Sequence, residues 1–148
     1  MQLGPDLRAF LACLNAEGVR YLVVGGYAVA AHGHPRYTKD LDVWLDASPA
    51  NAERLLGALD RFGFTGLGLQ ASDFTTPGSI VQLGYPPQRI DLLTTADGVD
   101  FETCHATRCD LELDDLSIPF IDLANLRKNK QASGRPRDLA DLDDLPTP

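Results

Sequence analysis

The chain has 148 residues, 44% of them hydrophobic and 23% charged, and its 21 acidic and 13 basic side chains give a net charge of −8. This size and balance predict one globular domain over residues 1–148. The acidic excess argues against a protein that binds along a nucleic-acid backbone, and no apolar run reaches the roughly 18 residues that a membrane span needs.

The sequence favours a cytoplasmic location without a membrane partner. Three cysteines, an odd number, do not suit a disulfide framework and fit a reducing compartment. The N-terminal stretch MQLGPDLRAF lacks a basic start followed by an apolar run, so we expect no signal peptide.

Hydrophobic periodicity and turn residues predict the elements of the first half of the chain. Leu7, Leu11 and Leu14 recur at helical spacing between Pro5, which suits a helix start, and Gly18, which suits a helix end. The patterns predict helices at 5–18, 26–33 and 48–63, strands at 20–25 and 38–46, and an unassigned glycine-rich stretch at 64–78.

The second half of the chain continues the mixed pattern. It predicts strands at 79–85 and 88–94 joined by a turn around Pro86 and Pro87, a short helix at 100–108, and closing helices at 122–134 and 135–145. Residues 109–121 alternate as a strand or as a hairpin with a turn near Asp114 and Asp115. The predicted fold class is α/β (α+β), a mixed β-sheet with helices packed on it.

Carboxylates stand in strands that are otherwise apolar. Asp40 and Asp42 point to one side of their strand together with Trp44, with the two aspartate alpha carbons about 6.5 Å apart. Burying two negative charges is costly unless a cation meets them, and Mg²⁺ prefers carboxylate oxygens. Asp91 is equally unexpected in its strand and could complete a two-metal site for phosphoryl or nucleotidyl transfer. The alternatives are a solvated sheet face with Trp44 at its edge and a structural role for Asp91.

Two further features suit a phosphate ligand. Gly25 and Gly26 follow a strand, where bare backbone allows a phosphate to approach and the next helix would aim its N–H groups at it. Five of the thirteen basic residues lie within 127–137, in an otherwise acidic chain. The alternatives are an ordinary strand-to-helix turn for the glycines and a solvated face for the basic run.

Other chemistry-bearing residues have ordinary explanations. His32 and His34 are more consistent with loop or helix-capping roles than with a metal site, and Arg36 suits either a phosphate or a carboxylate partner. Cys104 and Cys109 do not have a zinc-site spacing.

The stretch GGYAVAAHGHPRYTKDLDVWL and the tail KNKQASGRPRDLADLDDL resemble the nucleotidyltransferase superfamily of the polymerase-beta type. More narrowly, they resemble the small AbiEii-like and minimal nucleotidyltransferase group. The resemblance covers residues 20–145 and implies a nucleotidyltransferase fold that uses two Mg²⁺ ions and a nucleoside triphosphate.

The resemblance also implies roles for individual residues. Gly25 and Gly26 would line the triphosphate. Asp40, Asp42 and Asp91 would be the catalytic metal ligands, and Asp91 would help to deprotonate the acceptor hydroxyl. In the tail, Lys130 with Arg135 or Arg137 would match the family's basic residues, which suit phosphate contact.

The resemblance predicts transfer of a nucleoside monophosphate to an acceptor hydroxyl of a protein, a tRNA or a small molecule, with release of pyrophosphate. Two departures matter. Gly26 and Tyr27 follow the first glycine where many active relatives have a serine, and Arg137 replaces a lysine. The alternative prediction is therefore a non-catalytic binding module or a toxin–antitoxin component with a protein partner.

Overall fold

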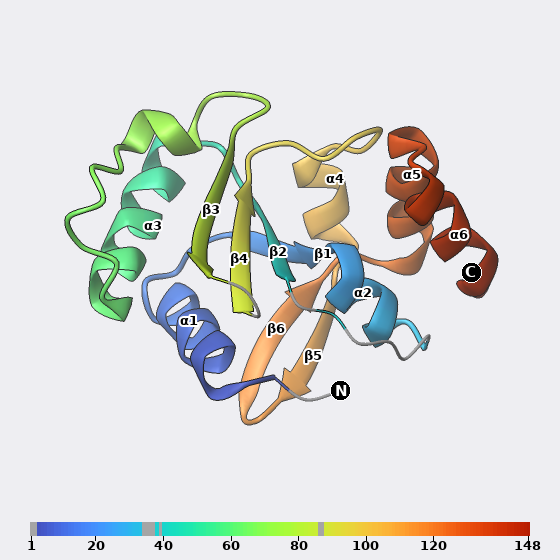
Figure 1. Cartoon of the computed structure of the whole chain (residues 1–148), viewed down its shortest axis with the longest axis horizontal. Helices are drawn as coiled ribbons and strands as arrows, with labels where there is room; N and C mark the ends of the chain where they lie inside the picture. The colour runs from blue at the N-terminus through green and yellow to red at the C-terminus, as the bar shows by residue number, and fades with distance from the viewer. Residues whose placement is uncertain (1–2, 34–37, 39, 86–87) are drawn as a thin grey trace.

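The computed structural model describes residues 3–33, 38, 40–85 and 88–148 (Figure 1). Its helices are α1 (Pro5–Ala16), α2 (Gly25–Ala31), α3 (Pro49–Phe62), α4 (Phe101–Ala106), α5 (Leu123–Ser133) and α6 (Pro136–Asp144), with a short 3₁₀ turn η1 (Ala71–Phe74). Its strands are β1 (Tyr21–Val24), β2 (Asp40–Leu45), β3 (Ile80–Tyr85), β4 (Gln88–Leu93), β5 (Cys109–Leu113) and β6 (Leu116–Phe120).

The strands form one mixed sheet in the order β3-β4-β2-β1-β6-β5. The pairs β1–β6 and β2–β4 are parallel, whereas β1–β2, β3–β4 and β5–β6 are antiparallel. The prediction of a mixed sheet with packed helices is confirmed. The parallel pair β2–β4 matters most for function, because it aligns the two strands that carry the unexpected aspartates.

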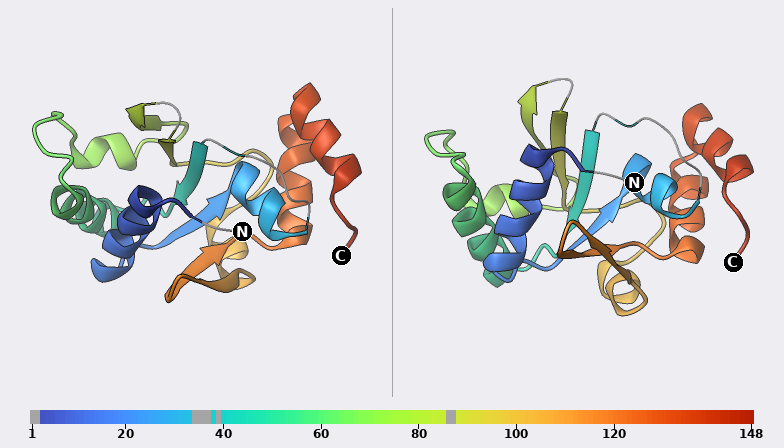
Figure 2. Two further views of the ribbon diagram at one scale, coloured as in Figure 1. Left: turned by 60° about the horizontal axis from the view of Figure 1, so that its bottom comes forward. Right: turned by 90° about the horizontal axis from the view of Figure 1, so that it is seen from below.

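Helices pack against the sheet and against one another. Helix α1 lies against α3, while α5 and α6 lie together at the other end of the molecule, with α5 beside α2 (Figures 1 and 2). Helix α3 begins where predicted, because the Ser48 side chain accepts the backbone N–H of Asn51 and Pro49 follows it. None of the helices that the structure describes is long and apolar enough to cross a membrane.

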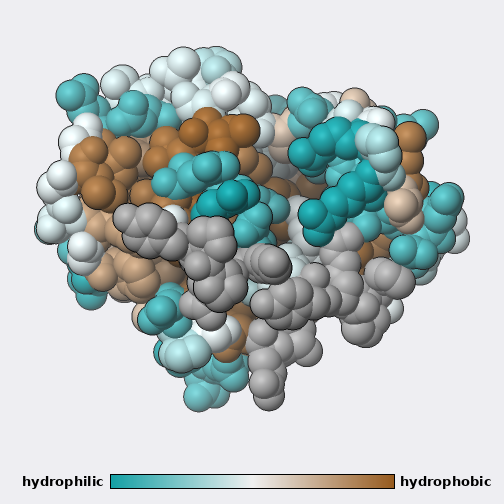
Figure 3. Space-filling view, in the orientation of Figure 1, coloured by the Kyte–Doolittle hydropathy of each residue, from teal (hydrophilic) through white to brown (hydrophobic). Residues whose placement is uncertain are grey.

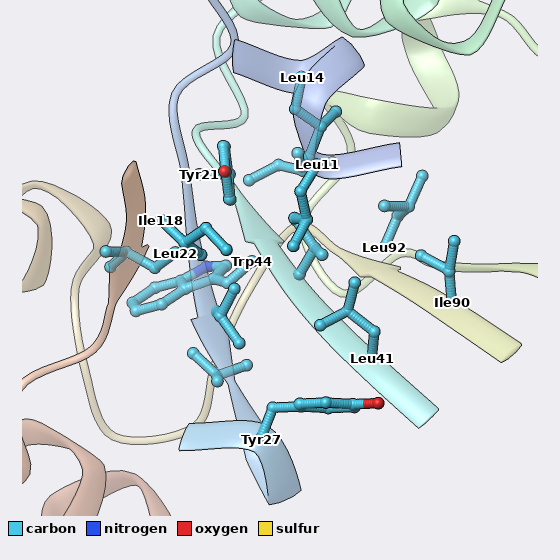
Figure 4. Close-up of a cluster of buried hydrophobic side chains, with 14 of the residues drawn as sticks. Leu11, Leu14, Tyr21, Leu22, Tyr27, Leu41, Trp44, Ile90, Leu92 and Ile118 are labelled. Atoms are coloured by element: carbon cyan, nitrogen blue, oxygen red, sulfur yellow. The ribbon is translucent and has the colours of Figure 1, made fainter. Parts of the chain in front are cut away.

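The core fills both sides of β2. Leu41 and Trp44 leave this strand on opposite sides, and each is fully or almost fully buried (Figure 4). The indole of Trp44 meets the ring of Phe101 of α4 edge to face, with ring centroids 5.3 Å apart. Trp44 therefore does not lie at a solvated edge, because α4 covers it, whereas Asp40 and Asp42 on the same side of β2 are part-exposed.

The predicted elements agree with the structure to within a few residues. Residues 109–121 form a hairpin rather than one strand, since Asp114 and Asp115 both adopt positive φ, as a two-residue hairpin turn requires. The main-chain carbonyl of Asp114 accepts two bonds from the Arg8 guanidinium, which ties the hairpin to α1. The predicted turn at Pro86 and Pro87 lies outside the described residues.

Candidate active site

A cavity of about 590 Å³ opens where β2, β4 and the start of α2 face the α5–α6 pair. It is lined by Gly25, Gly26, Thr38, Asp40, Asp42, Arg89, Asp91, Lys130, Arg135, Arg137 and Asp138. All eight residues that the sequence predicted for the site line this one cavity. Hydrophilic side chains gather over α5 and α6 and over the middle of the sheet (Figure 3).

Strand register brings the three aspartates together. In the parallel pair of β2 and β4, Asp42 lies opposite Asp91, and Asp40 lies opposite Arg89. Side chains two residues apart on a strand share a face, so these four groups point to the same side of the sheet. Asp91 is 8% exposed, and its carboxylate faces the cavity rather than the core.

Burial raises the pKa of Asp42 to about 7, and the negative charges of Asp91 and Asp40 and a hydrogen bond with Asp91 contribute to the rise. The nearby ammonium of Lys130 opposes this effect. The Asp42 carboxyl therefore holds a proton at a higher pH than an ordinary aspartate does. Carboxylates that lie this close together repel one another, so the site favours a cation.

The backbone at Gly25 fits closely around Asp42. Gly25 has a φ of 65°, in the left-handed region. A Cβ at this position would lie 2.1 Å from Oδ2 of Asp42, so a larger residue cannot occupy it without displacing the carboxylate. Glycine is required here for both reasons, which is a stronger requirement than an ordinary strand-to-helix turn imposes.

Arg89 is the functional residue that sequence reasoning missed most clearly. One guanidinium nitrogen lies 2.8 Å from Oδ2 of Asp40, and another lies 3.1 Å from Oδ1 of Asp91. The spacing in the sequence could have indicated it, because Arg89 precedes Asp91 by two residues and therefore lies on the same face of β4. Thr38 and Asp138 also line the cavity without having been predicted.

The basic tail divides into a buried part and an exposed part. Lys130 is 6% exposed, and its ammonium lies 3.1 Å from Asp138 and 3.0 Å from Asp141, which joins α5 to α6. Arg135 and Arg137 are exposed at the cavity. Arg135 also lies 2.7 Å from Asp138. The solvated-face alternative therefore describes Arg135 and Arg137 but not Lys130.

Acid is expected to weaken the α5–α6 junction through Asp138. Burial alone would raise the pKa of Asp138, but hydrogen bonds from Arg135, Ser133 and Lys130 lower it to about 2. A lowered pKa stabilises the fold above the unfolded value of 3.8, and this contribution disappears as the pH falls towards 2. It is on the order of 2 kcal/mol.

The measurement for this prediction is the free energy of urea unfolding at several pH values for wild type and Asp138→Asn. The deficit of the variant should be full at pH 6 and shrink steadily below pH 4. The exposed Asp143→Asn on the same helix is the matched control. A deficit that does not change with pH would contradict the prediction.

The donor set suits a hard divalent cation. Asp40, Asp42 and Asp91 offer carboxylate oxygens, which Mg²⁺ prefers, and burial together with the charges of Asp91 and Asp40 raises the pKa of Asp42. Within the described part of the chain, no group of three acidic, histidine or cysteine side chains has the geometry of a preformed metal site. Arg89 engages two of the three carboxylates, Asp40 and Asp91.

The structure describes some of the histidines and cysteines that the sequence analysis considered. Nε2 of His32 lies 2.7 Å from the backbone oxygen of Ile121, which supports a structural role just after α2. His34 and Arg36 lie outside the described residues. Cys104 and Cys109 are free thiols.

Two solved structures resemble this chain. TM1012 from Thermotoga maritima, a candidate nucleotidyltransferase, aligns over 93% of this chain and 88% of its own, with a TM-score of 0.62 and 18% identity. The lincosamide antibiotic adenylyltransferase LnuA, in its lincomycin-bound crystal structure, aligns over 97% of this chain and 96% of its own, with a TM-score of 0.52 and 15% identity. Comparisons with protein-family models and with curated protein sequences give no match.

The structural likeness establishes the fold. The chain has the nucleotidyltransferase fold, as its resemblance to that superfamily implied. The narrower resemblance to the AbiEii-like group stays a prediction.

Proposed function

We propose that the chain is a Mg²⁺-dependent nucleotidyltransferase that moves a nucleoside monophosphate from a nucleoside triphosphate to an acceptor hydroxyl and releases pyrophosphate. The observation that carries this proposal is the register of β2 and β4, which sets Asp42 opposite Asp91 beside the bare backbone of Gly25. The fold shared with nucleotidyltransferases supports it.

Asp40, Asp42 and Asp91 would hold the metal. When bound, Mg²⁺ supplies charge neutralisation at the phosphates and orients the reacting oxygens. The chain itself supplies the positioning. Gly25 and Gly26 line the cavity and have no side chains of their own, so phosphate oxygens can approach their backbone beside the Asp42 carboxylate. Asp91 sits at the cavity wall, where a carboxylate can accept the proton of an acceptor hydroxyl.

The basic tail supports binding of the triphosphate in two ways. Arg135 and Arg137 carry exposed guanidinium groups at the cavity and suit direct contact with phosphate oxygens. Lys130 would act mainly by holding α5 and α6 in place, because its ammonium is already engaged by Asp138 and Asp141. This differs from the direct phosphate contact that the resemblance implied for Lys130.

The proposed acceptor is any molecule that presents a hydroxyl group. A protein, a tRNA or a small molecule can each present a hydroxyl, and the net charge of −8 disfavours a long polyanion. The three free thiols support a cytoplasmic location.

The proposal is tested by incubating the protein with Mg²⁺, α-labelled nucleoside triphosphates, and separate pools of tRNA, protein and small hydroxyl compounds. We expect the label to appear in one pool together with stoichiometric pyrophosphate. The double variant Asp40→Asn/Asp42→Asn should give neither product. Calorimetric titration of Mg-ATP should likewise give weaker binding for the double variant, and equal binding by both proteins counts against the proposal.

A second function is a non-catalytic module, such as one component of a toxin–antitoxin pair. Two observations favour it: Gly26 stands where many active relatives have a serine, and Arg89 occupies two of the predicted metal ligands. Stable association with a protein partner, without label transfer under any condition above, would support this module over the enzyme.

A further inference from the structure

Arg89 holds a position that the proposed chemistry assigns to a cation. Its guanidinium lies 2.8 Å from Oδ2 of Asp40 and 3.1 Å from Oδ1 of Asp91, with a longer contact of 3.4 Å to Oδ2 of Asp91. Both carboxylates belong to the set predicted to bind metal. The fork of an arginine can bridge two carboxylates, which the single ammonium of a lysine does less well.

The surroundings of Arg89 explain why such a bridge is stable. The three aspartates would repel one another without a counter-ion. Lys130 is engaged by Asp138 and Asp141, so its charge is shared with carboxylates on another helix.

The same position allows Arg89 to leave. Its side chain is 32% exposed and lies on β4, next to the edge strand β3, at the wall of an open cavity. Because the guanidinium is already part-exposed, it can rotate into water while the hydrophobic core stays packed.

We propose that Arg89 is a built-in counter-ion that occupies Asp40 and Asp91 in the metal-free protein and is displaced when a divalent cation binds. Metal binding is thereby coupled to release of the guanidinium, and Arg89 lowers the affinity of the site for metal. This inference rests on the proposed function, because it requires that the carboxylates bind a divalent cation.

The test is the affinity for Mn²⁺, followed by the electron paramagnetic resonance signal of the free ion, in wild type, Arg89→Gln and Arg89→Lys. Arg89→Gln should bind about tenfold more tightly, because no charge-assisted bonds must be broken first. Arg89→Lys should fall between the two. The metal-free Arg89→Gln protein should also melt at a lower temperature than wild type, and Mn²⁺ should restore it.

Arg108→Gln is the matched control, as it removes an arginine from an exposed pair with Asp110 at the far edge of the sheet. Its affinity for Mn²⁺ should equal that of wild type. If Arg89→Gln binds Mn²⁺ no more tightly than wild type, the inference is overturned. If that variant does not fold without metal, Arg89→Lys decides: tighter binding than wild type supports the inference, and equal or weaker binding overturns it.

The two proposals fail in different ways. If wild type binds Mn²⁺ and Asp42→Asn does not, the metal site stands whatever the arginine variants do. If wild type and all the variants fail to bind Mn²⁺, the proposed function falls and the inference falls with it.

Discussion

Replacing Asp42 with asparagine is expected to abolish nucleotidyl transfer while stabilising the metal-free protein. Loss of one metal ligand removes several kcal/mol of transition-state stabilisation, which corresponds to about a 10³-fold loss of rate. The stability of the metal-free protein should change in the opposite direction. Burial and the charges of Asp91 and Asp40 raise the pKa of Asp42 to about 7, so the carboxylate destabilises the fold, and the substitution removes it.

The sign of the pH dependence follows from that raised pKa. Between the unfolded value of 3.8 and about 7, the folded protein binds more protons at Asp42 than the unfolded chain does, so wild type loses stability as the pH rises. The stability advantage of Asp42→Asn should be small at pH 4 and reach about 4 kcal/mol at pH 8.

The measurement is urea unfolding in the presence of a chelator at both pH values, alongside the transfer assay. Asp110→Asn, on the exposed edge strand β5, is the control and should change neither stability nor transfer. An Asp42→Asn protein that transfers label at the wild-type rate, or that is less stable at pH 8, would contradict the interpretation of this carboxylate.

The second large effect is expected at Gly25. Replacement by alanine places a Cβ 2.1 Å from Oδ2 of Asp42 and forces a non-glycine residue to adopt a φ of 65°. The left-handed conformation costs about 1–2 kcal/mol, and overpacking adds about 1–3 kcal/mol. We therefore expect Gly25→Ala to lose about 2–5 kcal/mol of stability, together with transfer activity, as measured by urea unfolding and the transfer assay.

Gly18→Ala separates the two contributions. Gly18 has a φ of 69°, and an added Cβ would meet nothing within 4 Å, so only the backbone term of about 1–2 kcal/mol should remain. The double variant Gly25→Ala/Asp42→Ala should be more stable than the sum of the single effects predicts, because the clash partner is gone. Equal losses for the two alanine variants would show that Asp42 does not constrain Gly25.

Much of the fold could be predicted because local signals and tertiary packing agree. Helix α3 is an example, since Ser48 and Pro49 mark its start and an apolar stripe marks its buried face. The parallel pairing of β2 with β4 could not be read from local pattern, because strand register depends on contacts far apart in the sequence. The sequence could propose Asp91 as a partner of Asp42 only on the condition that their strands are neighbours, and the register of β2 and β4 meets that condition.

The ion pairs of Lys130 and Arg89 could not be predicted from the sequence, because they join different helices and strands. Phosphate contact by Lys130 stays a prediction of the resemblance, and its partners Asp138 and Asp141 become available only when α6 folds back along α5. The sequence analysis assigned a role to Asp91 but none to Arg89, two residues before it. Its contact with Asp40 depends on the β2–β4 pairing.

The most direct test of the account is a crystal structure of the protein soaked with Mg²⁺ and a non-hydrolysable nucleoside triphosphate. The account predicts a cation about 2.1 Å from oxygens of Asp40 and Asp42, with Asp91 in the same cluster and the triphosphate against Gly25. A triphosphate bound away from this cavity, or one bound here while the three carboxylates hold no cation, would contradict it.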